Sequence, residues 1–186
     1  MEPFEIIGQI CGVFVIVAGV VAMQFSKRWQ ILLALGVLNL LTVFNMLFLG
    51  MSFSSVIGCA LAAVQCPISA YKAKKGLPVG KLENAVWSVL YFAAWGVGLY
   101  LSAQMGMASW RDALPFLGTV TFVLSVLLPK ERDVRIFSFL NALVYFIYNL
   151  LYLNVEAVSQ MLTMISIVIA LIRYREKKVE NKNAEI

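Results

Sequence analysis

Residues 45–50 read NMLFLG and residues 149–154 read NLLYLN, and the two stretches match when the chain is shifted by 104 positions, from 45 to 149. The same shift places the basic turn SKR at 26–28 on KER at 130–132. Similarity at one constant offset, over apolar and charged segments alike, is the signature of a structural repeat. The sequence therefore predicts that a unit in the N-terminal half occurs again in the C-terminal half.

The chain around these stretches has the composition of a membrane protein. Of its 186 residues, 61% are hydrophobic and only 13% are charged, which lies outside the range of soluble domains. Apolar runs of about 20 residues, the length at which a helix crosses a bilayer, recur along the whole chain. Because backbone groups in lipid must be paired within the segment, we expect an all-α integral membrane protein. Seven transmembrane helices are predicted, at about 6–24, 31–49, 53–71, 84–103, 113–129, 136–153 and 155–172.

The distribution of Lys and Arg indicates the orientation of these spans. Fourteen of the fifteen basic residues fall in the first, third and fifth connections and in the C-terminal tail, and only Arg111 falls elsewhere. Basic loops stay in the cytoplasm, so we expect the N-terminus outside and the C-terminus inside a plasma membrane. This topology explains the net charge of +5, so no nucleic-acid partner is needed to account for it. The expected partner of the basic residues is the lipid bilayer.

The repeat predicts how the seven spans are grouped. Three spans end on the side opposite to their start, so a second copy in the same orientation needs one extra crossing, which span four supplies. The result is a 3+1+3 arrangement of two parallel three-helix repeats. The predicted division is a first bundle at 1–75, a linker helix at 76–110, a second bundle at 111–178 and a polar, frayed cytoplasmic tail at 179–186. Transporters with such repeats bind substrate near the bilayer midplane, at the repeat interface.

Polar side chains form stripes within several spans. One face of span six, about 100° wide, carries Asn and Tyr residues, and spans two, three and seven carry further amides and hydroxyls. Unpaired amides are costly in hydrocarbon, so these faces should point inward. One interpretation is that they line a central polar cavity, which we favour for Asn45 and Asn149; the other is interhelical hydrogen bonding and close packing. The candidate substrate-binding residues are Asn149, Tyr148, Tyr145, Asn45, Asn141, Asn39, Gln65, Ser159 and Thr163.

Two residues are candidates for gating. Pro67 lacks a backbone donor and is expected to kink or loosen span three, where it would act as a hinge. Glu156 begins span seven, where the helix N-terminus favours a carboxylate, although a carboxylate at a cavity mouth would also bind a cation or carry a proton. The stripe of Trp87, Tyr91 and Trp95 on span four is interpreted as an interface anchor with packing.

Signals for catalysis are poor. The chain has no histidine, no carboxylate pair within a span and no nucleophile elbow or phosphate loop. The three cysteines lie inside apolar runs without a CxxC motif or a paired framework. We therefore expect no enzyme, no cofactor and no metal site.

The segments IIGQICGVFVIVAG, NLLTVFNMLFLGMSFSSVIG, LPFLGTVTFVLS, RIFSFLNALVYFIYNLLYL and IALIRYREKK resemble the bacterial inner-membrane YgjV family, over about residues 5–178. That family is grouped with the SWEET and PQ-loop superfamily of small transporters, so the resemblance implies two three-helix bundles joined by an inversion helix. It implies no particular substrate. The Pro-Gln dipeptide that names PQ-loop proteins is missing, since Gln65 and Pro67 occur in reverse order on span three.

These observations favour a facilitator that moves a small polar, neutral or zwitterionic solute, such as a sugar, nucleoside or vitamin, by alternating access. The alternative is a membrane scaffold or partner subunit that keeps the fold without transport. Both repeats are present in one chain, so a dimer is not needed to complete the fold, and a homo-oligomer stays an open alternative.

Overall fold

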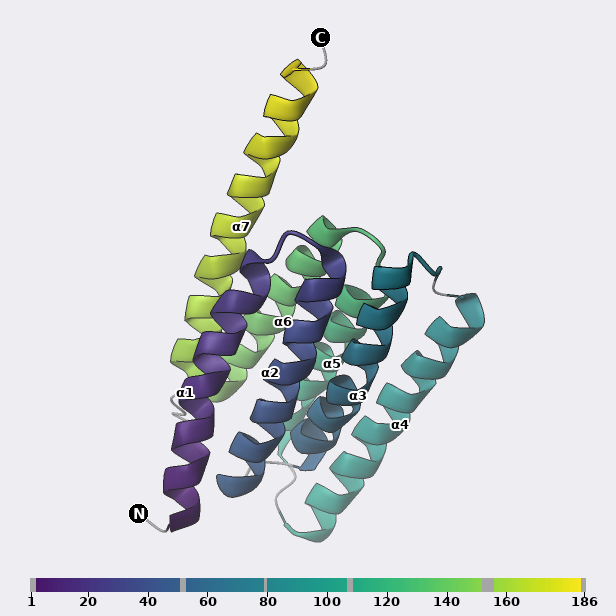
Figure 1. Ribbon diagram of the computed structural model, residues 1–186. Coiled ribbons are helices and arrows are strands. Elements are labelled where there is room, and N and C mark those ends of the chain that lie inside the picture. Colours follow the sequence, from purple (N-terminus) through teal and green to yellow (C-terminus); the bar gives the residue numbers. More distant parts are fainter. Residues whose placement is uncertain (1–2, 51–52, 79, 107–108, 152–155, 185–186) are drawn as a thin grey trace.

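The computed structural model describes residues 3–50, 53–78, 80–106, 109–151 and 156–184, with side chains between 6 and 174 except those of Gln9 and Asp112. These ranges contain seven α-helices, one short 3-10 helix η1 (Trp110–Asp112) and no strand (Figure 1). The helices are α1 (Pro3–Gln24), α2 (Arg28–Phe48), α3 (Phe53–Lys75), α4 (Lys81–Gln104), α5 (Ala113–Leu127), α6 (Glu131–Leu151) and α7 (Glu156–Ala184).

Each helix coincides with a predicted span, and six of those described are long and apolar enough to cross a membrane. The exception is α5, whose 15 residues extend about 22 Å, less than the roughly 30 Å of a hydrocarbon core. The polar tail differs from expectation, because α7 continues as a helix to Ala184 instead of fraying after 178. In Figure 1, this last part of α7 projects beyond the other helices.

The helix bounds follow the repeat seen in the sequence. A shift of 104 moves the end of α1 from 24 to 128 and the start of α2 from 28 to 132. Each position lies one residue beyond the corresponding bound of α5 or α6. The similarity of the two segments therefore extends from side chains to the places where helices begin and end. Of the motif NLLYLN, residues 152–154 lie outside the described ranges.

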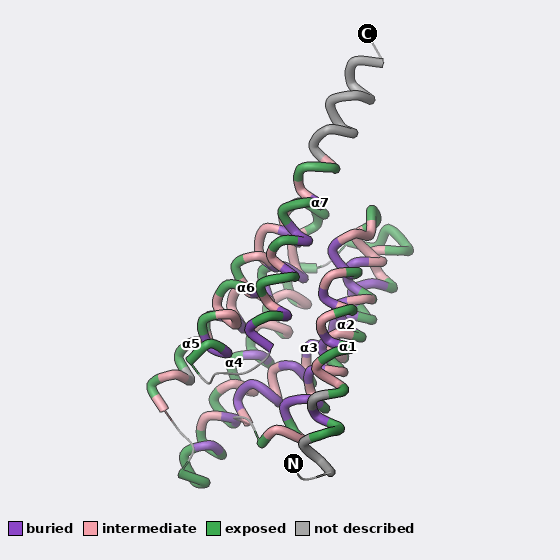
Figure 2. Tube along the Cα trace, turned by 90° about the vertical axis from the view of Figure 1, so that its left-hand side faces the viewer, coloured by how far each residue is buried: buried purple, intermediate pink, exposed green. Residues whose placement is uncertain are grey.

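The packing order of the helices is the same in both segments. The middle helix of each triplet packs against its two neighbours: α2 against α1 and α3, and α6 against α5 and α7. The triplets meet along two seams, an extensive one between α1 and α7 and a narrow one between α3 and α5. Helix α4 packs mainly on α3 and also touches α5, so it lies beside the narrow seam (Figures 1 and 2).

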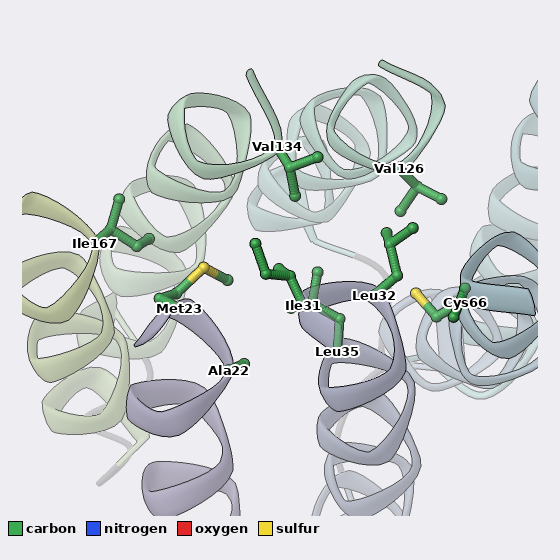
Figure 3. Packing of buried hydrophobic residues seen from close by; sticks show 10 residues of the cluster. Ala22, Met23, Ile31, Leu32, Leu35, Cys66, Val126, Val134 and Ile167 are labelled. Atoms are coloured by element: carbon green, nitrogen blue, oxygen red, sulfur yellow. The ribbon is translucent and has the colours of Figure 1, made fainter. Parts of the chain in front are cut away.

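One end of the bundle, here called the basic end, holds the α1–α2, α3–α4 and α5–α6 connections, and it is the upper end in Figure 1. An apolar cluster fills the interior near this end and draws residues from all six helices of the two triplets (Figure 3). We call it the basal cluster, and its buried members are Ala22, Met23, Ile31, Leu32, Leu35, Cys66, Ala70, Val126, Val134 and Ile167.

Candidate functional site

Nearly all of the candidate site residues from the sequence lie in the interior. Asn141 and Tyr145 are half-buried and Pro67 is exposed, while the others are buried, namely Asn39, Asn45, Gln65, Tyr148, Asn149, Glu156, Ser159 and Thr163. The inward direction of the stripes, which follows from the cost of exposing amides to lipid, is therefore observed. The hydrogen-bond partners of these side chains in the interior differ from one residue to the next.

One asparagine in each triplet joins two neighbouring helices. The Asn45 Nδ2 atom on α2 donates to the Gly8 carbonyl on α1 at 2.9 Å, and Asn141 Nδ2 on α6 donates to the Gly118 carbonyl on α5 at 2.8 Å. Glycine permits this close approach, because a Cβ atom at Gly12 would lie 3.0 Å from Asn45 Nδ2. The amide group of Asn45 thus serves helix packing through its nitrogen, while its Oδ1 is buried with no hydrogen-bond partner among the described residues.

Asn39 has a more local role than the stripe suggested. Its Nδ2 atom donates to the Leu35 carbonyl of the same helix at 2.7 Å. The hydroxyl of Thr42 likewise donates to the Leu38 carbonyl at 3.0 Å. Such bonds to the preceding turn satisfy polar side chains within one helix and carry no information about a ligand.

Glu156 and Asn149 lie together at the end of the bundle opposite to the basic end. The Asn149 amide acts as a hydrogen-bonding neighbour of the Glu156 carboxylate. Cys59 on α3 and Tyr145 on α6 both lie within electrostatic range of that carboxylate. Residues of α3, α6 and α7 therefore converge here, and the first turn of α7 adds its N-terminal dipole.

Tyr145 connects the two triplets. Its ring packs against the buried cluster of Met46, Val56 and Cys59, which belongs to α2 and α3. It also meets the Tyr148 ring edge-on, with 6.2 Å between the ring centroids. A Cβ atom at Gly118 would come within 2.5 Å of the Tyr145 ring, so only glycine on α5 allows this position.

Gln65 is the buried polar residue whose surroundings fit it least. Its side chain on α3 is fully buried, and neither Nε2 nor Oε1 has a hydrogen-bond partner among the described residues. A buried polar group without a partner costs about 1–3 kcal/mol, so such groups are rare unless water or a ligand satisfies them. The amide of Gln65 therefore needs a partner that the described residues do not supply.

Tyr91 on α4 also has a buried polar group without a described partner, and the interpretation of its stripe as an interface anchor with packing did not identify it. The residue is 2% exposed, and its hydroxyl also lacks a hydrogen-bond partner among the described residues. The ring packs between Ala62 of α3 and Phe122 of α5, while the hydroxyl lies within electrostatic range of Cys66 and Cys59. Its place far from both ends of the span, where no aromatic belt explains a tyrosine, is the signal that could have found this residue.

The basic end is closed by two arginines that act across the triplets. Arg28, the first residue of α2, donates to the carbonyls of Leu128 at 3.0 Å and Val126 at 2.7 Å, at the end of α5. Arg135, in the second turn of α6, donates to the carbonyls of Phe25 at 2.7 Å and Met23 at 3.4 Å, at the end of α1. Helix C-termini present unpaired carbonyls with a negative dipole, which cations stabilise.

We call these reciprocal contacts the arginine clasp. The sequence predicted Arg28 and Arg135 only as topogenic charges in loops, with span six beginning at 136. The prediction was wrong about Arg135, because α6 begins at Glu131 and the side chain of Arg135 is 2% exposed. Carbonyls of the other triplet replace the water that a loop arginine would have kept.

Gln24 holds the α1–α7 seam at the same end. Its Nε2 atom donates to the Ser166 hydroxyl at 2.7 Å and to the Ser166 backbone carbonyl at 3.0 Å. The backbone carbonyl of Gln24 accepts from the Tyr174 hydroxyl at 3.0 Å. The Arg135 guanidinium lies 4.3 Å from the centroid of the Tyr174 ring, a cation–π contact that links the seam to the clasp. The seam is therefore polar and specific as well as extensive.

Within the described ranges, no three Cys, Asp or Glu side chains gather closely enough to hold a metal ion. The interior offers amides, hydroxyls and aromatic rings instead. This chemistry suits hydrogen bonding and stacking with a small polar molecule.

Comparison with known proteins places the chain in a family. No curated protein and no solved structure matches it. The model of the family described as Imp-YgjV, bacterial inner membrane protein, matches residues 6–178, which is nearly the whole chain. The helical, membrane-spanning bundle agrees with that description. The protein belongs to the YgjV family of bacterial inner membrane proteins.

Proposed function

We propose that the chain has a SWEET-like 3+1+3 architecture, with α1–α3 and α5–α7 as parallel repeats and α4 as the inversion helix. The common offset of the helix bounds and the equivalent packing order in the two triplets support this arrangement. The charge bias favours a cytoplasmic basic end with the N-terminus outside. The division at 1–75, 76–110 and 111–178 follows the same repeat.

We further propose that the protein is a facilitator for a small polar, neutral or zwitterionic solute. The observation that carries this proposal is the fully buried amide of Gln65, whose nitrogen and oxygen are both unpaired among the described residues. An apolar residue of similar size would be cheaper at this position if the site served packing alone. A transport site instead needs polar groups that become satisfied when substrate enters.

Alternating access would require the contacts at the basic end of the bundle to open. The basal cluster and the arginine clasp join the two triplets at the basic end, and both would have to separate for solute to pass. All hydrogen-bond acceptors described for the clasp are backbone carbonyls. Rocking of the two triplets about the extensive α1–α7 seam would release the clasp. Pro67, inside α3, is the proposed hinge.

A second candidate function is that of a membrane scaffold or partner subunit. The hydrogen bonds of Asn45, Asn141 and Asn39 to backbone carbonyls favour it, because they show polar side chains engaged in packing. Under this alternative, the unpaired groups would hold ordered water instead of a substrate.

A thermal-shift screen distinguishes the facilitator from the scaffold. Purified protein in detergent is screened against sugars, nucleosides, vitamins, amino acids and small amines. A ligand at 100 times its dissociation constant adds about 2.7 kcal/mol to the free energy of unfolding. We expect at least one class to raise the melting temperature of the wild type and to lose this effect in Gln65→Met. Folded protein that responds to no class would favour the scaffold.

A further inference from the structure

We infer that α4 is part of the binding site, with Tyr91 as a substrate-binding residue that acts together with Gln65. This inference rests on the proposed function and goes beyond the role of α4 as a connector. It names a residue and a ligand chemistry: a neutral solute whose carbonyl or hydroxyl oxygen accepts a hydrogen bond from the Tyr91 hydroxyl.

The position of Tyr91 within the bundle supports the inference. Most of α4 faces outward, as Leu82, Val89 and Tyr100 do, with 63–80% of each side chain exposed. Tyr91 is the large aromatic residue of α4 that is directed fully inward, at 2% exposure. A tyrosine used only for packing would keep its hydroxyl at the interface or paired, since phenylalanine fills the same space without a polar atom.

The neighbours of Tyr91 place its side chain against the stretch of α3 that carries Gln65. The ring rests on Ala62, which precedes Gln65 by three residues and so lies on the same side of α3. The hydroxyl lies within electrostatic range of Cys59 and Cys66, which flank that turn of α3, and of Tyr145 on α6. Two polar groups that have no partner among the described residues, one on α3 and one on α4, are thus associated with the same stretch of α3.

The chemistry of these groups defines the ligand. At neutral pH the tyrosine hydroxyl is a donor that can also accept, and the glutamine amide presents one acceptor and two donors. Trp95, one turn further along α4, adds a buried Nε1 atom that is also unpaired among the described residues and can only donate. The set is richer in donors than in acceptors and carries no charge, so it matches an uncharged solute with exposed oxygen acceptors.

The two seams between the triplets differ in extent, and this difference gives a reason for α4 to contribute to the binding site. The α1–α7 seam is extensive and hydrogen-bonded through Gln24, while the α3–α5 seam is narrow and has α4 beside it. The rings of Trp95 and Phe116 pack against each other in a tilted arrangement on this side, with 4.7 Å between the ring centroids. If the triplets part where they hold each other least, the space between α3 and α5 opens next to Tyr91.

The test is ligand binding by the full-length protein in detergent, measured by thermal shift with glucose, uridine and nicotinamide as probes. The variant Tyr91→Phe removes one hydroxyl, and Tyr100→Phe is the matched control, because it removes the same atom from an exposed position on the same helix. We expect Tyr91→Phe to weaken binding of the active probe about five- to tenfold, as loss of one hydrogen bond does, and Tyr100→Phe to leave it unchanged.

The outcomes distinguish this inference from the function on which it rests. Wild-type protein that binds none of the probes would overturn both. Binding by the wild type with an equal affinity in Tyr91→Phe would overturn the role of α4 and leave the proposed function standing. A lower melting temperature of ligand-free Tyr91→Phe would mean that the hydroxyl has a structural partner, which also overturns the inference.

Discussion

Replacing Gln65 with methionine tests whether the buried amide serves a ligand or the stability of the fold. Methionine has nearly the same length and shape as glutamine and carries no strong hydrogen-bonding atom. In the structure, both amide atoms of Gln65 are buried and unpaired among the described residues. Each such group costs about 1–3 kcal/mol, so Gln65→Met should raise the free energy of unfolding by at least about 1 kcal/mol.

The control for this prediction is the same substitution at Gln24. This residue donates to Ser166 at two sites and accepts from Arg173 at 3.1 Å, so its polar atoms are paired. Gln24→Met should lower the free energy of unfolding by about 0.5–1.5 kcal/mol, opposite in sign to the effect at Gln65.

Reversible unfolding in mixed micelles, followed by circular dichroism, measures both changes. The reasoning is refuted if Gln65→Met is destabilised by 1 kcal/mol or more. In that case the amide has a structural partner, such as an ordered water, and the main observation behind the proposed function disappears.

Three further predictions concern the packing. Gly98→Ala should detach α4 from α3 and lower the free energy of unfolding by about 2 kcal/mol or more, because the added Cβ would clash with a backbone atom of α3. Gly96→Ala is the control: nothing lies within 4 Å of its added Cβ, so it should be neutral or slightly stabilising in the same unfolding assay. Arg135→Gln should open the basic end, and this can be measured in a protein that keeps Cys66 as its single cysteine. Cys66 is fully buried in the basal cluster, so we expect maleimide to label it faster in the variant. An unchanged labelling rate would contradict the role of the arginine clasp. Asn45→Ala should lower stability by about 0.6–1 kcal/mol, the scale of interhelical bonds in membranes, and a larger loss would show a role beyond the bond to α1.

Without any tertiary information, the sequence determined that this is a helical membrane protein, where its helices lie, and which faces of them are polar. These features depend on local physics. A backbone in lipid must pair its own groups, a span must match the bilayer thickness, and side chains at helical spacing share a face. The repeat register was also readable, because it needs only the comparison of two segments. Orientation and the central cavity stay predictions.

The tertiary structure decided which polar groups are satisfied, because that depends on helices far apart in the chain. Asn45 and Gln65 are both amides on inward faces, yet one donates to the Gly8 carbonyl on a neighbouring helix while the other has no described partner. Arg135 reads as a loop charge until the end of α1 supplies acceptors 110 residues away. The lack of a described partner for the Tyr91 hydroxyl likewise could not be read from the sequence, since the periodicity of its stripe fits packing equally well. Hydrogen bonds between helices follow from crossing geometry, which no local pattern encodes.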